Sequence, residues 1–212
     1  MAARPSVDVG LELRGLEQVI PYPIARDIVL KNPDHIVVIE CPCRAGRVDP
    51  CQPVDVCVIV GEPFASFMAE HHVKRSRWIS QAEAVEILRA EHERGHVHHA
   101  FFKDAMLGRF YAICNCCSCC CGAMEAFAHG VPMLASSGYV NRVDAQACVS
   151  CAQACPFHAL EMGETAVRVD EARCMGCGVC VSKCPRQALS LVRDPEKGEP
   201  LDVRELAGSR AA

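Results

Sequence analysis

Cysteine is the residue that could do chemistry in this chain, and its thiols fall into three groups along the sequence. There are 17 cysteines among 212 residues, more than packing requires. Thiolates bind soft metals and iron–sulfur clusters. The number is odd, and the opening residues, MAARPSVDVG, lack the apolar stretch of a secretory signal, so a scaffold of paired disulfides is disfavoured. The sequence therefore predicts metal binding.

The last group has the spacing of an iron–sulfur site. Cys174, Cys177 and Cys180 are each separated by two residues, and Cys184-Pro185 closes the run. In such a run three thiolates of one loop hold a cubane [4Fe–4S] cluster, and the fourth cysteine ligates a second cluster. A structural zinc site is the alternative, because paired CxxC motifs also bind zinc.

This group also contains an internal repeat. RVDAQACVSC at 142–151 matches RVDEARCMGC at 168–177, and CPFHALEM at 155–162 matches CPRQALSL at 184–191. The first copy is one cysteine short. We interpret the difference as a deletion of three residues that removed its third ligand.

Residues 140–192 resemble a bacterial-type two-cluster ferredoxin domain. The resemblance implies one complete cluster, held by Cys174, Cys177, Cys180 and Cys155. The second cluster is left with three protein thiolates, those of Cys148, Cys151 and Cys184. It could be a [3Fe–4S] cluster, take an outside ligand or be absent, and we expect an occupied but atypical site. His158 is a candidate substitute ligand, although an exposed helix residue is the preferred interpretation.

The first two groups follow no standard motif. The first contains Cys41, Cys43, Cys51 and Cys57. These thiolates could complete a cubane or a zinc site. The second contains Cys114, Cys116, Cys117, Cys119, Cys120 and Cys121. Adjacent cysteines can point to opposite sides of the chain, so this stretch could serve two centres, or one cubane, or one larger non-cubane centre. We favour Cys114, Cys116, Cys117 and Cys120 as its iron ligands.

The combination of CPCR at 41–44 with ICNCCSCCCG at 113–122 resembles a family of bacterial 4Fe-4S-binding proteins of anaerobic metabolism. The resemblance implies iron–sulfur binding in the N-terminal half and supplies no reaction. Arg44 and Arg47 could offset the charge of a thiolate-bound cluster, or they could be solvated loop residues.

The elements that position these cysteines can be predicted in part. PYPIARDIVLKNPD predicts a helix that ends at Asn32-Pro33, and a strand follows over 35–40. A short helix is predicted over 62–72, and Ser80 with Glu83 forms a capping box for a longer one. HVHHAFF and RFYAI predict two strands. The histidines of the first of these could converge on a metal, but we interpret His96, His98 and His99 as polar residues on an exposed strand face.

These elements predict an α+β protein. A small N-terminal α/β cysteine-rich domain, similar in its helices and hairpin to a winged helix, is expected over 1–135. A ferredoxin-like βαββαβ iron–sulfur domain is expected over 136–194, and 195–212 is predicted to be a flexible tail.

Charge and motifs narrow the function. The formal net charge is -4, which excludes the basic footprint of a nucleic-acid binder, and no apolar run reaches the length of a membrane span. Neither GxGxxG nor GxxxxGK[ST] is present. We therefore expect a cytoplasmic protein with two or more [4Fe–4S] clusters that carries single electrons to a redox protein partner. The alternative is a redox enzyme subunit whose cluster binds or activates substrate at an open iron.

Overall fold

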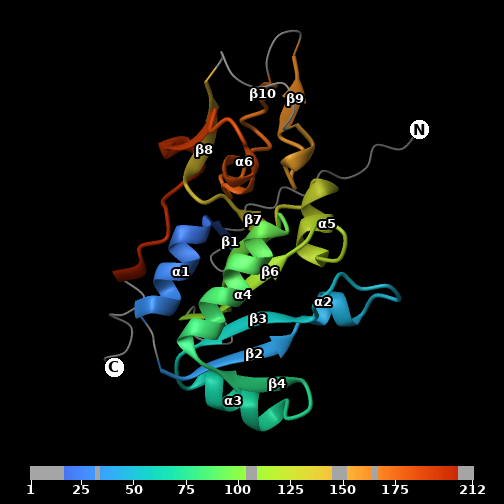
Figure 1. Cartoon of the computed structure of the whole chain (residues 1–212), viewed down its shortest axis with the longest axis vertical. Helices are drawn as coiled ribbons and strands as arrows, with labels where there is room; N and C mark the ends of the chain where they lie inside the picture. Colours follow the sequence, from blue (N-terminus) through green and yellow to red (C-terminus); the bar gives the residue numbers. More distant parts are fainter. Residues whose placement is uncertain (1–16, 32–33, 104–108, 145–151, 164–166, 205–212) are drawn as a thin grey trace, which may run out of the picture.

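A computed structural model describes residues 17–31, 34–103, 109–144, 152–163 and 167–204. The described residues form two units, a large mixed sheet with helices and a smaller unit of two strand pairs (Figure 1). The larger unit contains β1 (Glu17–Ile20), α1 (Tyr22–Lys31), β2 (Ile36–Glu40), α2 (Pro42–Ala45), β3 (Asp55–Val60), α3 (Phe64–His71), β4 (Ser76–Ile79), α4 (Gln81–Glu93), β5 (Val97–Lys103), β6 (Arg109–Cys116), α5 (Gly122–Ala128) and β7 (Leu134–Ala135).

The sheet of the larger unit has seven strands in the order β4-β2-β3-β6-β5-β1-β7. Its neighbouring strands are antiparallel except at the edge, where β1 and β7 run parallel. This sheet is larger than the helix-and-hairpin unit expected from the sequence. The two predicted strands of the hairpin, β5 and β6, lie inside it, and β6 delivers the chain into the cysteine-rich stretch.

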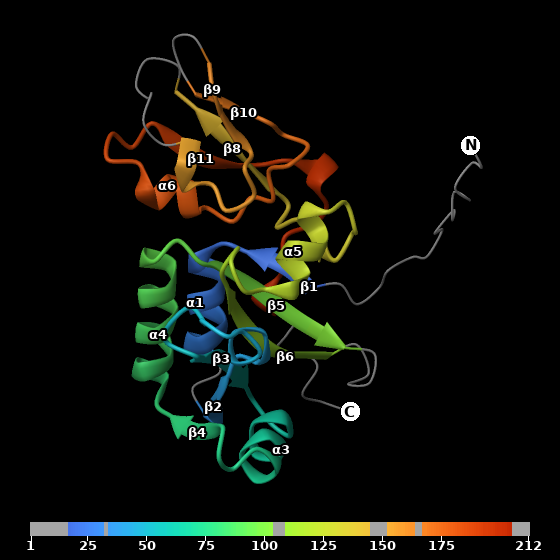
Figure 2. The ribbon, with the colours of Figure 1, turned by 90° about the vertical axis from the view of Figure 1, so that its right-hand side faces the viewer.

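Helices cover both faces of the sheet. Alternation along β2 and β3 sends Ile36 and Val58 toward α1 and α4, whereas Val37 and Ile59 pack against α3 on the other face. Residues of β6 alternate in the same way: Ile113 packs with α1 and α4, and Ala112 packs with α3. Figure 2 shows α1 and α4 lying together along one side of the sheet.

The smaller unit contains β8 (Tyr139–Val143), the 3-10 turn η2 (Ala152–Ala154), β9 (Leu160–Met162), β10 (Val167–Val169), α6 (Val179–Lys183) and β11 (Leu189–Arg193). Its outer strands β8 and β11 pair antiparallel, and so do its inner strands β9 and β10. The unit therefore has helices and strands in an α+β arrangement, with the cysteine loop between β10 and α6.

One apolar core joins the two units. It combines Val19 and Val97 of the sheet with Phe157 and Val179 of the smaller unit. The rings of Phe127 and Phe157 meet edge to face across the join, with centroids 5.8 Å apart. In Figure 2, α5 lies between the sheet and the smaller unit. The cysteine-bearing segments of both units are thus packed against each other.

The local predictions from the sequence can be checked against the helix ends. The first helix ends at Lys31, directly before the predicted stop. At the start of α4, the Ser80 side chain accepts a hydrogen bond from the backbone N–H of Glu83, as the predicted capping box requires. None of the helices in the described ranges has the length and apolarity to cross a bilayer.

Part of the predicted tail is packed onto the protein. Residues 195–204 belong to the described ranges and begin with the 3-10 turn η3 (Pro195–Lys197). Val203 is buried in the core beneath α1 and α4. The Gln18 side chain of β1 donates to the carbonyl of Glu199 at 2.8 Å, which attaches this segment to the edge of the sheet. The remainder of the predicted tail, 205–212, lies outside the described residues.

Candidate metal centres

The C-terminal quartet, which comprises Cys155, Cys174, Cys177 and Cys180, is assembled from both halves of the internal repeat. Its members are buried and interact electrostatically with one another. Burial raises the pKa of Cys180 to about 12 and raises the pKa values of Cys155 and Cys177. A bound cation must displace those protons, because the thiolate is the ligand.

One side-chain amide and two backbone N–H groups around the quartet donate hydrogen bonds to its sulfurs. The Nδ2 of Asn141 lies 3.3 Å from the Cys180 Sγ, and the Asn141 backbone nitrogen lies 3.5 Å from the Cys174 Sγ. The backbone nitrogen of Ala159 lies 3.3 Å from the Cys155 Sγ. Hydrogen bonds to sulfur stabilise thiolates and tune a cluster's potential.

A glycine brings the cysteine loop close to strand β8. Gly176 has a φ of +65°, and a Cβ placed on it would lie 2.3 Å from the Tyr139 carbonyl oxygen. The Ser137 hydroxyl donates to the Gly176 carbonyl at 2.8 Å and so holds the loop against the strand. Only glycine fits this position, which explains its place between Cys174 and Cys177.

The structure repeats the turn that follows each Cys-Pro. The backbone nitrogens of Ala159 and Ala188 each lie 3.3 Å from the sulfur four residues before them, that of Cys155 or Cys184. His158 occupies the same turn position as Gln187, at the same φ of 53°, and it is exposed. Its side chain is exposed, as the preferred interpretation expects, but the residue lies in a turn and not on a helix.

The second ferredoxin-type site is only partly described. Cys184 is buried, and its sulfur accepts a hydrogen bond from the chain. The other predicted ligands, Cys148 and Cys151, lie outside the described residues.

The larger unit brings six cysteines into a closed thiol ring. The side chains interact in the order Cys41, Cys43, Cys121, Cys116, Cys114, Cys57 and back to Cys41. The ring joins the end of β2, the middle of β3, the end of β6 and the start of α5. Strand pairing explains the contact, because β6 lies directly beside β3 and β3 directly beside β2.

Within the thiol ring, the two cysteines with lowered pKa values, Cys43 and Cys114, occupy opposite positions. Hydrogen bonds from Cys121 and Cys41 hold the pKa of Cys43 far below its ordinary value. Hydrogen bonds from Cys116 and Cys57 lower the pKa of Cys114 to about 6. The four neighbours have raised pKa values as a result of this sharing and of burial. The ring thus has two sites where negative charge is already favoured.

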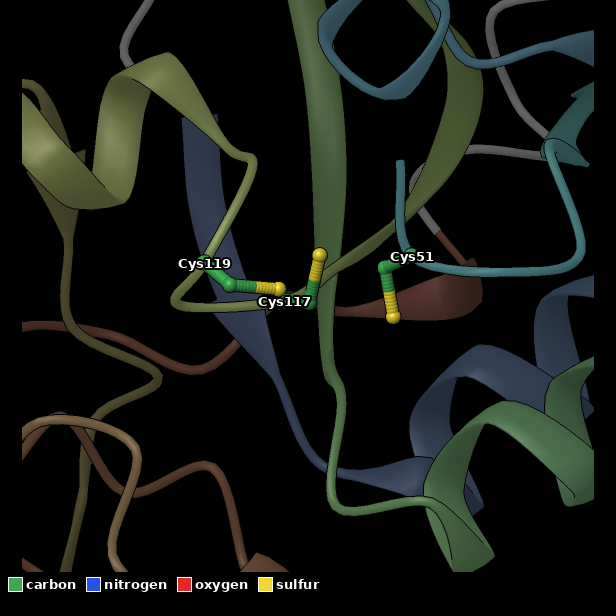
Figure 3. A group of neighbouring side chains, drawn as sticks. All are labelled: Cys51, Cys117 and Cys119. Carbon is green, nitrogen blue, oxygen red and sulfur yellow. The ribbon is translucent and has the colours of Figure 1, made fainter. Parts of the chain in front are cut away.

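The other four cysteines of the larger unit form a second group, called the surface thiols after its exposed member Cys119; they are Cys51, Cys117, Cys119 and Cys120. Cys51 is half-buried, and Cys117 and Cys120 are buried. The sulfurs of Cys51, Cys117 and Cys119 lie within 4.8 Å of one another, and those of Cys119 and Cys120 are 3.7 Å apart. Figure 3 shows Cys51 on its own loop. Cys117 and Cys119, which follow β6 in the chain, lie beside it. The backbone nitrogen of Cys51 lies 3.5 Å from the Cys120 Sγ, so this loop is attached to the turn.

Arg44 connects the two groups of thiols from inside the protein. Its side chain is 1% exposed and donates to the Glu91 carboxylate at 2.5 Å and to the Asn115 carbonyl at 2.9 Å. Burial opposes the charge of Arg44, the Glu91 carboxylate more than offsets this and raises the pKa of Arg44, and Cys117 and Cys51 add smaller contributions in the same direction. Arg47, in contrast, is half-exposed and pairs with Glu125. Arg44 therefore offsets thiolate charge from a buried position, and Arg47 does so from the surface.

These contacts divide the sequence groups differently from their order in the chain. Cys51 is separated from Cys41, Cys43 and Cys57 and joins the surface thiols. The four cysteines favoured as ligands in the second group are also divided: Cys114 and Cys116 belong to the thiol ring, and Cys117 and Cys120 to the surface thiols. That this stretch serves two metal centres stays a prediction.

The interpretation of the histidines as exposed was wrong. His98 and His99 are at most 1% exposed, and His96 is 8% exposed. Strand β5 is paired on both edges, by β6 and β1, and its faces are covered by packing: the His98 ring lies against Tyr22 of α1 and His92 of α4. The Nε2 of His96 lies 3.7 Å from the Cys51 Sγ, and a ring nitrogen of His99 lies within 4.8 Å of the sulfurs of Cys116 and Cys121.

The sizes of the groups indicate what each could hold. The C-terminal quartet supplies the four buried thiols that a cubane takes. The hydrogen bonds to its sulfurs and the closely packed Gly176 also fit a cubane. The surface thiols are close enough for a single ion or for the edge of a cluster. The thiol ring has more donors than the four a cubane takes.

Comparison with known families supports iron–sulfur chemistry for the smaller unit. Residues 167–190 match the 4Fe-4S binding domain family, and the match contains Cys174, Cys177, Cys180 and Cys184. This match supports an iron–sulfur protein with [4Fe–4S] as a cofactor and points to electron transfer. Neither a curated protein nor a solved structure matches the chain.

Proposed function

We propose that this protein carries single electrons through a series of iron–sulfur centres, one in the C-terminal quartet and at least one in the larger unit. The observation that carries the proposal is the shared apolar core. Cys116 and Cys121 of the thiol ring border the same core as Cys155, Cys174 and Cys177 of the quartet. Two centres that border the same apolar core are suitably placed to exchange electrons.

The smaller unit would have a ferredoxin-like arrangement in this proposal. Its paired outer and inner strands, its repeated Cys-Pro turns and the matched family support that reading. Bound clusters supply reversible one-electron chemistry. The residues of the chain hold the sulfurs, donate hydrogen bonds to them and keep water out of the core between the units.

Electrons must also enter and leave, and two thiols reach the surface. Cys43 of the thiol ring is exposed, and so is Cys119 of the surface thiols. A partner could therefore reach the larger unit directly. The net charge of -4 favours docking to a redox protein with a basic patch. The N-terminal unit would then be the point of exchange.

The test is the metal content of protein purified without oxygen. We expect about eight to twelve irons with equal sulfide, and electron paramagnetic resonance (EPR) signals from interacting clusters after reduction. About four irons would leave one cubane and contradict the multi-centre part of the proposal. Zinc in place of iron and sulfide would contradict electron transfer altogether.

Three matched variants identify the centres. Cys177→Ser should remove the signal of the quartet, Cys116→Ser that of the thiol ring, and Cys117→Ser that of the surface thiols. Loss of the same signal in all three variants would mean one centre or a common folding defect, and far-ultraviolet circular dichroism distinguishes these. A spectrum of the wild type that is the sum of independent clusters would contradict exchange through the shared core.

A further inference from the structure

The thiol ring has a neighbour that is not a cysteine. His99 lies on β5 directly opposite Cys114 of β6, and Val97 lies opposite Cys116. Residues opposite each other in an antiparallel pair share a face of the sheet, so His99 is on the face that carries Cys114 and Cys116. One ring nitrogen of His99 lies within 4.8 Å of the sulfurs of Cys116 and Cys121.

A carboxylate fixes the orientation of this imidazole. The Nδ1 of His99 lies 3.0 Å from the Oε2 of Glu17 on β1, the neighbouring strand. An Nδ1–H that donates to a carboxylate leaves the lone pair on Nε2, which is the arrangement found behind histidine ligands of metals. The Glu17 side chain is 15% exposed and that of His99 is 0% exposed, so the pair is protected from solvent.

The Nε2 atom of His99 has no hydrogen-bond partner among the described residues. A buried polar atom without a partner costs about 1–3 kcal/mol. His98 also has an unpartnered Nε2, but it lies on the opposite face, where its ring packs near Tyr22 and His92. His99 alone of the two combines the free nitrogen with nearby thiols and an orienting carboxylate.

From these contacts we propose that His99 is a ligand of the metal centre in the thiol ring, bound through Nε2 and oriented by Glu17. The proposal rests on the proposed function, because it needs iron in the ring. The site would then combine imidazole and thiolate ligation. A neutral imidazole carries less negative charge than a thiolate, so this centre would accept an electron more readily than an all-cysteine one.

The test is nitrogen hyperfine spectroscopy of the reduced, full-length protein. Protein with ¹⁵N-labelled histidine is compared with unlabelled protein, so that no variant has to fold. We expect a strong histidine coupling on the signal that Cys116→Ser removes. His99→Gln should abolish the coupling, and His96→Gln, beside Cys51, should leave it unchanged. A thiol-ring signal without histidine coupling would overturn this proposal while the electron-transfer proposal stands.

A second measurement distinguishes ligation from packing. Glu17→Gln keeps a hydrogen-bond acceptor but removes the negative charge, so the coupling should remain and the potential of this centre should become more positive. A purely structural Glu17–His99 pair would give no histidine coupling in either protein and no change of potential in the variant, and this result would overturn the proposal. Absence of any iron signal from the thiol ring would overturn it together with the multi-centre function.

Discussion

Arg44 and Glu91 form an ion pair in which both side chains are only 1% exposed and the Nη2–Oε2 distance is 2.5 Å. Arg44 also donates to the Pro53 carbonyl at 2.5 Å, so one guanidinium holds α4 and the loop that carries Cys51. Arg44 also interacts electrostatically with Cys57 of the thiol ring and with Cys51 and Cys117 of the surface thiols.

Removing the arginine should therefore destabilise the whole unit. Arg44→Met leaves the Glu91 charge buried without its partner, and we expect a loss of about 3–5 kcal/mol in the free energy of unfolding by urea. The double variant Arg44→Met/Glu91→Met should recover part of this loss. Arg47→Met, which breaks the exposed pair with Glu125, is the control and should change stability little. Equal effects of both single variants would contradict the buried-pair argument.

The buried His98 gives stability a pH dependence. Burial lowers its pKa to about 3, whereas an unfolded histidine has a pKa near 6.5. The folded state thus binds fewer protons, so the contribution of His98 is complete above about pH 6.5 and is lost as the pH falls toward 3. Between pH 6.5 and 5 the loss should be about 2 kcal/mol.

Urea unfolding of the wild type and of His98→Asn at pH values from 5 to 7.5 checks this dependence. The variant should be less stable at pH 7.5 but should lose less stability on acidification. His92 also has a lowered pKa through burial, so some slope should remain in the variant. An unchanged slope would show that His98 is not the titrating group.

Two exposed thiols should differ in reactivity once metal is removed. The pKa of Cys43 is lowered by hydrogen bonds from Cys121 and Cys41, whereas burial raises the pKa of Cys119. Alkylation of Cys43 should therefore be independent of pH between 6 and 8, and that of Cys119 should rise roughly tenfold per pH unit. Mass spectrometry of iodoacetamide-treated protein measures both rates in one sample. Parallel pH profiles would contradict the ring of hydrogen bonds.

Asn141 should raise the potential of the C-terminal quartet. Its Nδ2 lies 3.3 Å from the Cys180 Sγ, and such a hydrogen bond favours the reduced, more negative cluster. Asn141→Leu should therefore shift the midpoint in an EPR-monitored titration to a more negative value. Ser137→Ala removes a bond to the Gly176 carbonyl and none to sulfur, so it serves as the control. A shift of the same size in both would assign the effect to loop geometry.

The sequence predicted the parts of the structure that depend on short spacing. The loop from Cys174 to Cys180 and the capping by Ser80 are local, and both could be inferred from adjacent residues. The thiol ring could not, because its composition depends on the pairing of β2, β3 and β6, which are distant in sequence.

The prediction that the histidines are exposed was wrong for a related reason. HVHH has no apolar alternation to show which of its faces is covered, and it is buried by strand pairing on both edges together with packing against α1 and α4. The signal that could have found His99 is its place opposite Cys114, which becomes visible only when the strand register is known.

Strand β6 and the turn after it supply thiols to both groups of the larger unit, Cys114 and Cys116 to one and Cys117 to the other. The two groups consequently share a backbone and cannot be distorted separately. Loss of metal from either should loosen the other, so the larger unit should fill and empty as one cooperative step.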